Sequence, residues 1–181
     1  MIEIGAVKIK DGAIIDRFDK FINPGCHIPD NITQLTEITD DMVKDADDEK
    51  TVTQEFLDWS GNCPMVAHNA KFDISFVQMA MNKYDMGPFT NTVIDTLELS
   101  RQLDQGFARH SLSALLKRYN VPFDEESHHR ADYDAEGTAL VFDKMLKQLI
   151  QQNIETISEI DTKLVPKEEI HEGSEENSEN A

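Results

Sequence analysis

The sequence predicts one α/β domain with a mixed sheet. The first observation is a β hairpin at the start, in which apolar residues alternate over 2–10, Asp11-Gly12 provides a strong turn signal, and a return strand follows over 13–22. The second is a pair of short apolar segments, 65–67 and 92–94, which are typical of buried strands. A helical pattern follows each of them, and this alternation is typical of α/β folds.

The spacing of apolar residues places the remaining elements. In the first strand the alternation changes phase after Ala6, which predicts a β-bulge near Gly5 and Ala6. Asp95 and Ser111 are suitable N-caps for helices. The expected helical segments are short turns at 31–35 and 40–43, a stripe built on Val52, Phe56 and Trp59, and longer helices over 73–83, 96–103, 112–119 and 132–152.

The chain is strongly acidic. Its 181 residues carry a net charge of −18, of which nine acidic and two basic residues over 151–181 contribute −7, leaving −11 for 1–150. Such a domain does not attract nucleic acid by bulk electrostatics, so divalent cations would have to mediate a phosphodiester contact. Residues 156–181 lack apolar anchors and are expected to be a disordered tail or linker after a domain over 1–155.

The two cysteines, Cys26 and Cys63, form neither a disulfide framework nor a metal motif. Reduced cysteines are typical of the cytosol. The sequence contains no apolar run of about 20 residues and no signal-peptide pattern. We therefore expect a cytoplasmic protein that has no membrane partner.

One junction between a strand and a helix carries polar side chains, at the place where open α/β sheets bind ligands. In VAHNAKFD, over 66–73, a strand ends in a turn and Asp73 lies on the first turn of the next helix. Asp73 is a candidate functional carboxylate. It also suits a purely structural role, because a negative charge is favoured at the positive end of a helix dipole.

A second group of polar residues lies before the last helix. In HHRADYD, over 128–134, His129 lies in a loop and Asp134 lies five residues later, inside the helix. A loop imidazole and a helix carboxylate can thus converge on one point. The alternatives are that Asp132 is an ordinary N-cap, or that the histidines and aspartates bind metal as in a His/Asp phosphohydrolase.

Together these segments resemble the DEDDh exonucleases, the family of replicative proofreading subunits with a ribonuclease H-like fold. VAHNAKFD is similar to the second motif of that family, and HRADYD has the His-x4-Asp spacing of the third. The segments INPG, LTEITDDMV and DTLELSR also follow the family's order. The resemblance covers about residues 3–150. The sequence of residues 2–18 and 128–139 is most similar to the exonuclease domain embedded in PolC-type DNA polymerase III.

The resemblance implies proofreading hydrolysis of a single-stranded DNA 3′ end by two Mg²⁺ or Mn²⁺ ions, ~4 Å apart and held by four carboxylates. Asp73 and Asp134 would supply two carboxylates, and His129 would deprotonate the attacking water. The rest of the polymerase III polypeptide or replisome would be the partner. The residues implied to line the nucleotide pocket or to position the loop and substrate are Leu35, Ile38, Thr39, His68 and Asn69.

The first motif of the family, Asp-x-Glu-Thr, has no convincing match. The family carries it on a central strand just before the segment matching 2–10, so we expect an N-terminally truncated domain that lacks this strand and two of the four carboxylates. The chain alone is then expected to be inactive or nearly so. A smaller departure is Glu37, where relatives usually have Gly.

Two other functions remain open from the sequence. A non-catalytic binding or scaffold module could keep the fold after losing its site, although the retained Asp73, His129 and Asp134 speak against that history. A His/Asp phosphohydrolase acting on nucleotides is disfavoured, because further histidines at ligand spacing are absent.

Overall fold

The β hairpin forms as its turn sequence predicts. In the computed structural model, which describes residues 1–122 and 131–154, β1 (Glu3–Lys10) pairs antiparallel with β2 (Ala13–Phe21). Asp11 and Gly12 have φ of 53° and 77°, and positive φ at both central residues is what a type I′ turn requires.

The other predicted elements are also confirmed, with small shifts of their ends. The longer helix predicted from residue 73 begins three residues earlier, which leaves Asp73 within its first turn. Asp95 and Ser111 cap helices as expected. The elements are α1 (Asp30–Thr36), α2 (Asp40–Val43), α3 (Glu49–Ser60), β3 (Met65–Ala67), α4 (Ala70–Lys83), β4 (Val93–Asp95), α5 (Thr96–Leu103), α6 (Leu112–Arg118) and α7 (Ala131–Gln151).

The bulge prediction was wrong in position. The register of the hairpin shifts between Lys8 and Ile9, where β2 contributes one extra residue, Ile15, rather than near residues 5 and 6. A bulge of this kind adds a residue on one strand only, and here it lies on the strand opposite the one in which we expected it.

The phase change in β1 arises because helices cover both of its faces. Ile4 and Ala6 belong to a cluster with Phe18 and residues of α3 and α4, whereas Ile9 packs against the cluster of α5, α6 and α7. A strand buried on both faces is apolar at both parities, so a change of phase in its pattern does not require a bulge.

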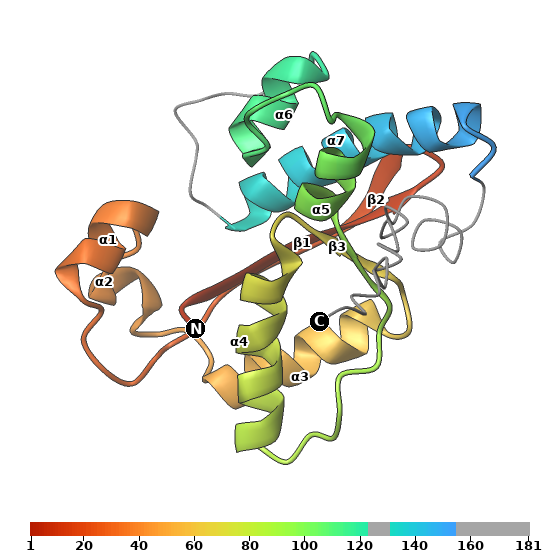
Figure 1. The fold of residues 1–181 in the computed structure, drawn as a ribbon. Coiled ribbons are helices and arrows are strands. Elements are labelled where there is room, and N and C mark those ends of the chain that lie inside the picture. Colours follow the sequence, from red (N-terminus) through yellow and green to blue (C-terminus); the bar gives the residue numbers. More distant parts are fainter. Residues whose placement is uncertain (123–130, 155–181) are drawn as a thin grey trace, which may run out of the picture.

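The strands form two separate sheets. Among the described residues, β1 pairs with β2 alone, and β3 pairs in parallel with β4. No strand within 1–122 and 131–154 joins β1 to β3, which is the position expected for the strand of the first motif. The mixed α/β arrangement is confirmed, since it combines an antiparallel and a parallel pair with helices packed around them (Figure 1).

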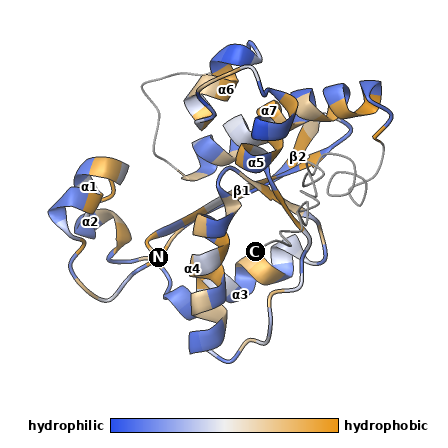
Figure 2. Cartoon of the chain, viewed as in Figure 1, coloured by the Kyte–Doolittle hydropathy of each residue, from blue (hydrophilic) through white to orange (hydrophobic). Residues whose placement is uncertain are grey.

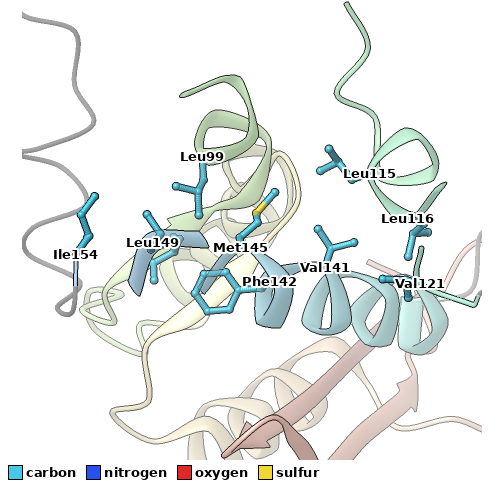
Figure 3. Packing of buried hydrophobic residues seen from close by; sticks show 10 residues of the cluster. Leu99, Leu115, Leu116, Val121, Val141, Phe142, Met145, Leu149 and Ile154 are labelled. Atoms are coloured by element: carbon cyan, nitrogen blue, oxygen red, sulfur yellow. The ribbon is translucent and has the colours of Figure 1, made fainter. Parts of the chain in front are cut away.

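Three apolar clusters hold these elements together. The largest lies between α5, α6 and α7, where Leu99, Leu115, Val141 and Met145 point toward one another (Figure 3). A second joins the hairpin to α3 and α4. A third lies in the lobe of α1 and α2, beside the N-terminus, and joins it to Ile2 and Phe21 at the end of the hairpin (Figure 1). The apolar stripes of α4 and α7 are visible in Figure 2. No helix of the described ranges is long and apolar enough to cross a membrane.

Helix α7 begins in very close contact with β1. A Cβ atom at Gly5 would lie 2.1 Å from the backbone N of Asp132 and 2.2 Å from the carbonyl carbon of Ala131. The backbone N–H of Ala131 donates to Oε2 of Glu3 at 3.0 Å, two residues earlier on the same strand. Only glycine at position 5 allows the helix to approach the strand so closely.

The substitution Gly5→Ala should therefore destabilise the fold strongly. We expect a loss of about 3 kcal/mol in the free energy of unfolding, because the methyl group would overlap backbone atoms that cannot rotate away. Urea unfolding measures this loss in the free energy of unfolding. The matched control is Gly106→Ala, whose methyl group would meet nothing within 4 Å. Equal unfolding midpoints for the two variants would contradict the contact.

Candidate active site

A tight turn between β3 and α4 presents Asp73. After β3, Asn69 adopts a left-handed conformation with φ 64° and ψ 49°, and the N–H of Phe72 donates to the carbonyl oxygen of Asn69 at 2.9 Å. Asparagine tolerates this conformation better than most residues, because its short polar side chain can bond locally. Helix α4 starts at once, and Asp73 lies on its first turn.

Asp95, the last residue of β4, binds this turn through its carboxylate. Oδ1 accepts from the N–H of Asn69 at 2.9 Å, and Oδ2 accepts from the N–H of Ala70 at 3.0 Å. Oδ1 also accepts from the N–H of Leu97 at 2.9 Å, which caps α5. The contact is possible because β3 and β4 are parallel and paired, with Asp95 opposite Ala67. One carboxylate thus organises the starts of α4 and α5.

His68 is anchored beside this contact. Its Nδ1 lies 3.0 Å from Oγ1 of Thr96, and Thr96 is fully buried. Burial lowers the pKa of the His68 imidazole, partly offset by the charge of Asp95 and a hydrogen bond with the backbone of His110. His68 is thus half-buried and hydrogen-bonded to Thr96.

Asp134 lies on α7, far from Asp73 in the sequence but close enough to affect its ionisation. The pKa of Asp73 is raised from 3.8 to about 6, chiefly because surrounding protein atoms displace water. The N–H of Asp73 itself opposes the shift, whereas the charges of Asp134 and then Asp95 add to it. Asp73 keeps a solvent-exposed surface, so its carboxylate is dehydrated only in part. The two carboxylates that the sequence singled out thus lie within electrostatic range of each other.

The other site predictions have separate outcomes. His129 lies within 123–130, outside the described residues. Leu35 and Thr39 are exposed, but Ile38 is only 1% exposed and packs with Ile28 and Val43 in the core of the small lobe. No group of three or more His, Cys, Asp or Glu side chains that could hold a metal is present in the described part of the chain.

The lobe also shows why glycine is usual at position 37. Glu37 ends α1 with φ 60° and ψ 9°, in the left-handed region, and its N–H donates to the carbonyl oxygen of Thr33 at 2.8 Å. Glycine is the residue that commonly ends helices in this conformation. The side chain of Glu37 is exposed, so the departure from the family lies in backbone strain at this position.

Two carboxylates that organise the site were not identified from the sequence. Asp95 was predicted only as the cap of one helix, and Glu3 as one position of an alternating strand. Their bonds to Asn69, Ala70 and Ala131 join elements far apart in the chain. The only sequence signal was the place of Asp95 at the end of a strand, where ligand-binding residues of α/β sheets lie.

The sequence and the fold of this chain are those of an exonuclease family. The family model described as Exonuclease matches residues 1–142, and the chain therefore belongs to this exonuclease family. The chain is 44% identical over 164 residues to DNA polymerase III PolC-type of Staphylococcus haemolyticus and to that of Staphylococcus aureus. These matches cover 91% of this chain and 11% of each relative, so the chain spans about a ninth of their length.

Solved structures agree with this assignment. Exonuclease X in complex with 5′ overhanging duplex DNA superposes with a TM-score of 0.65 and 26% identity, covering 82% of this chain and 83% of that chain. The nuclease domain of 3′hExo, a DEDDh family member bound to rAMP, superposes with a TM-score of 0.65 at 20% identity, covering 85% and 82%. The second likeness shows the shared fold, which the resemblance to DEDDh exonucleases had implied.

Replacing Glu37 with glycine should stabilise the protein. We expect Glu37→Gly to raise the free energy of unfolding by about 0.5–1 kcal/mol, because relief of left-handed strain exceeds the added entropy of the unfolded chain. Chemical denaturation measures the change. Gln34→Gly, within α1, is the matched control and should lower stability by about 1 kcal/mol. A loss of stability in Glu37→Gly would refute the strain.

The ionisation of Asp73 should make stability depend on pH. Because its folded pKa is raised from 3.8 to about 6, its contribution to the free energy of unfolding is fully present below about pH 4 and is lost as the pH rises through about 6. At about pH 7.5, Asp73→Asn should exceed the wild type by about 1 kcal/mol, after allowance for solvent screening. At about pH 3.5 the advantage should disappear.

Thermal unfolding at the two pH values measures this difference, with Asp45→Asn as the control for loss of an exposed carboxylate. Mg²⁺ should also stabilise the wild type more than Asp73→Asn at the higher pH, because a ligand that binds only the folded state stabilises it. An advantage of Asp73→Asn that is the same at both pH values would show that Asp73 titrates normally.

Proposed function

We propose that the chain is the 3′–5′ exonuclease region of a PolC-type DNA polymerase III, which removes 3′-terminal nucleotides from DNA during proofreading. The observation that carries the proposal is that Asp73 on α4 and Asp134 on α7 lie within electrostatic range, since the charge of Asp134 adds to the rise in the pKa of Asp73 that burial chiefly causes. Two carboxylates held near each other, one of them partly dehydrated, favour a bound divalent cation that relieves their repulsion.

Asp73 and Asp134 would hold Mg²⁺ or Mn²⁺, which prefer oxygen ligands. When bound, two such ions supply stabilisation for the attacking and leaving oxygens of a phosphodiester. His129 would accept the proton of the attacking water, because an imidazole with a pKa near ~6.5 is suited to this transfer at neutral pH. Asn69 would position the substrate from the turn before α4, and His68 would hold that turn in place.

The small lobe would bind the terminal nucleotide. Leu35 and Thr39 are accessible and would line the pocket directly. Ile38 would act from beneath, because its side chain is buried among Ile28 and Val43 and supports the lobe that carries the other two. Direct contact between Ile38 and a base would require this small core to open.

Contacts with the DNA beyond the scissile phosphate would come from outside this chain. Because residues 1–150 carry a charge of −11, bound divalent cations would attract the scissile phosphate locally, and the rest of the polymerase polypeptide or the replisome would hold the strand. The proposed setting is the cytoplasm, where bacterial replication takes place. Exonuclease X is solved with duplex DNA, and DNA is the substrate proposed for this chain.

The chain alone should show no more than trace exonuclease activity, since two carboxylates are too few for a two-ion site. Adding an upstream segment of family sequence that carries Asp-x-Glu-Thr should raise activity with Mg²⁺ or Mn²⁺ by at least about 100-fold, because each missing ligand removes charge stabilisation of the transition state. Release of nucleotides from a 3′-labelled single strand measures it. The added strand should also raise the melting temperature, because it can pair with β1 and β3.

Variants of the extended chain separate the gain in activity from the gain in stability. Changing the added Asp and Glu to Asn and Gln should keep most of the stability and lose nearly all hydrolysis, and Asp134→Asn should do the same. Robust hydrolysis by the unmodified chain that His129→Ala abolishes would refute the need for the first motif. An extended chain that becomes stable yet stays inactive would refute the exonuclease proposal and favour a non-catalytic binding or scaffold module.

A further inference from the structure

We propose that Asp95 is a positioning residue that sets the place of Asp73 by holding the first two N–H groups of the turn before α4. This inference deepens the proposed function, and rests on it, because it assigns to Asp95 control over how well Asp73 binds a divalent cation. In this role Asp95 would act through Asp73, without touching the reacting phosphate or the ions.

The geometry shows a fixed link between two strand ends and one helix start. The carboxylate of Asp95 accepts from three backbone N–H groups at 2.9, 3.0 and 2.9 Å, two of them in the turn and one in α5. Thr96, the next residue, contacts the imidazole of His68. Asp95 at the end of β4 and Thr96 at the start of α5 therefore hold His68, Asn69 and Ala70, and Asp73 follows three residues after Ala70.

The turn needs such a link because its own conformation is costly. The left-handed region is unfavourable for residues other than glycine, although less so for asparagine, and Asn69 has φ 64° and ψ 49°. Its side chain forms no bond with the helix start. Hydrogen bonds to a charged carboxylate are stronger than those between neutral groups, so the bonds to Asp95 can keep the turn in place. Without Asp95 the turn could relax, and the first turn of α4 would shift with it.

Cation binding by variants of Asp95 distinguishes an effect of its charge from an effect of the position of its carboxylate. Asp95→Asn keeps Oδ1 for Asn69 and Leu97 but replaces Oδ2, so an amide N–H would face the N–H of Ala70. Asp95→Glu keeps the charge but moves the carboxylate by one methylene. If charge alone mattered, Asp95→Glu would bind cations as the wild type does. If position matters, both variants bind more weakly.

The experiment measures Mn²⁺ affinity by water-proton relaxation, and hydrogen exchange at the amides of Asn69 and Ala70 by NMR, on the whole chain. We expect both Asp95 variants to bind Mn²⁺ about 5–10-fold more weakly, and Asp95→Asn to exchange at Ala70 at least about 10-fold faster, since a factor of ten corresponds to one hydrogen bond to a charged group. The matched control is Asp48→Asn, which alters the cap of α3, where Asp48 accepts from the N–H of Thr51 at 2.8 Å. It should change neither quantity.

Each result has a defined meaning. Unchanged exchange at Ala70 in Asp95→Asn, or wild-type Mn²⁺ affinity in Asp95→Glu, would overturn the inference. Asp73→Asn tests the proposed function separately. If it leaves Mn²⁺ binding unchanged, Asp73 is not a ligand and the proposed function fails, whereas the exchange data still show whether Asp95 holds the turn.

Discussion

The contact between the start of α7 and the backbone of β1 is the constraint on which the candidate site depends. Gly5 allows the two backbones to meet at a distance that no side chain would permit, and Glu3 accepts the N–H of Ala131 beside it. Asp134 follows within the first turn of α7, so β1 sets its position. The large apolar cluster then holds the rest of the helix against α5 and α6 (Figure 3).

The other carboxylate, that of Asp73, is positioned by a separate contact of the same chemical kind. Asp73 depends on β4 through Asp95, and Asp134 depends on β1 through Glu3. In both cases a carboxylate on a strand accepts hydrogen bonds from N–H groups at the start of a helix. Those N–H groups need such an acceptor because they have no partner within the helix. The pKa of Asp73 is raised chiefly by burial, and the nearby charge of Asp134 adds to that rise.

What the sequence could predict follows from how local each signal is. The Asp11-Gly12 turn, the caps at Asp95 and Ser111, and the helical stripes depend on neighbouring residues, and the structure confirms them. The bulge was misplaced because β1 is covered on both faces, which no local pattern reveals. Asp73 and Asp134 could be singled out by resemblance, but the contacts of Asp95 and Glu3 could not, because each joins segments that only the fold brings together.

These contacts also bear on why the proposed reaction would depend so completely on cations. A helix N-terminus normally offers N–H groups and a partial positive charge to a phosphate. At α4 the carboxylate of Asp95 takes the leading N–H groups, and at α7 Glu3 takes that of Ala131. In the two helices that carry Asp73 and Asp134, N–H groups at the start are therefore already bonded to a carboxylate of the protein. In the proposed function, attraction for a phosphodiester would then come from bound divalent ions, which would allow an acidic domain to act on an acidic substrate.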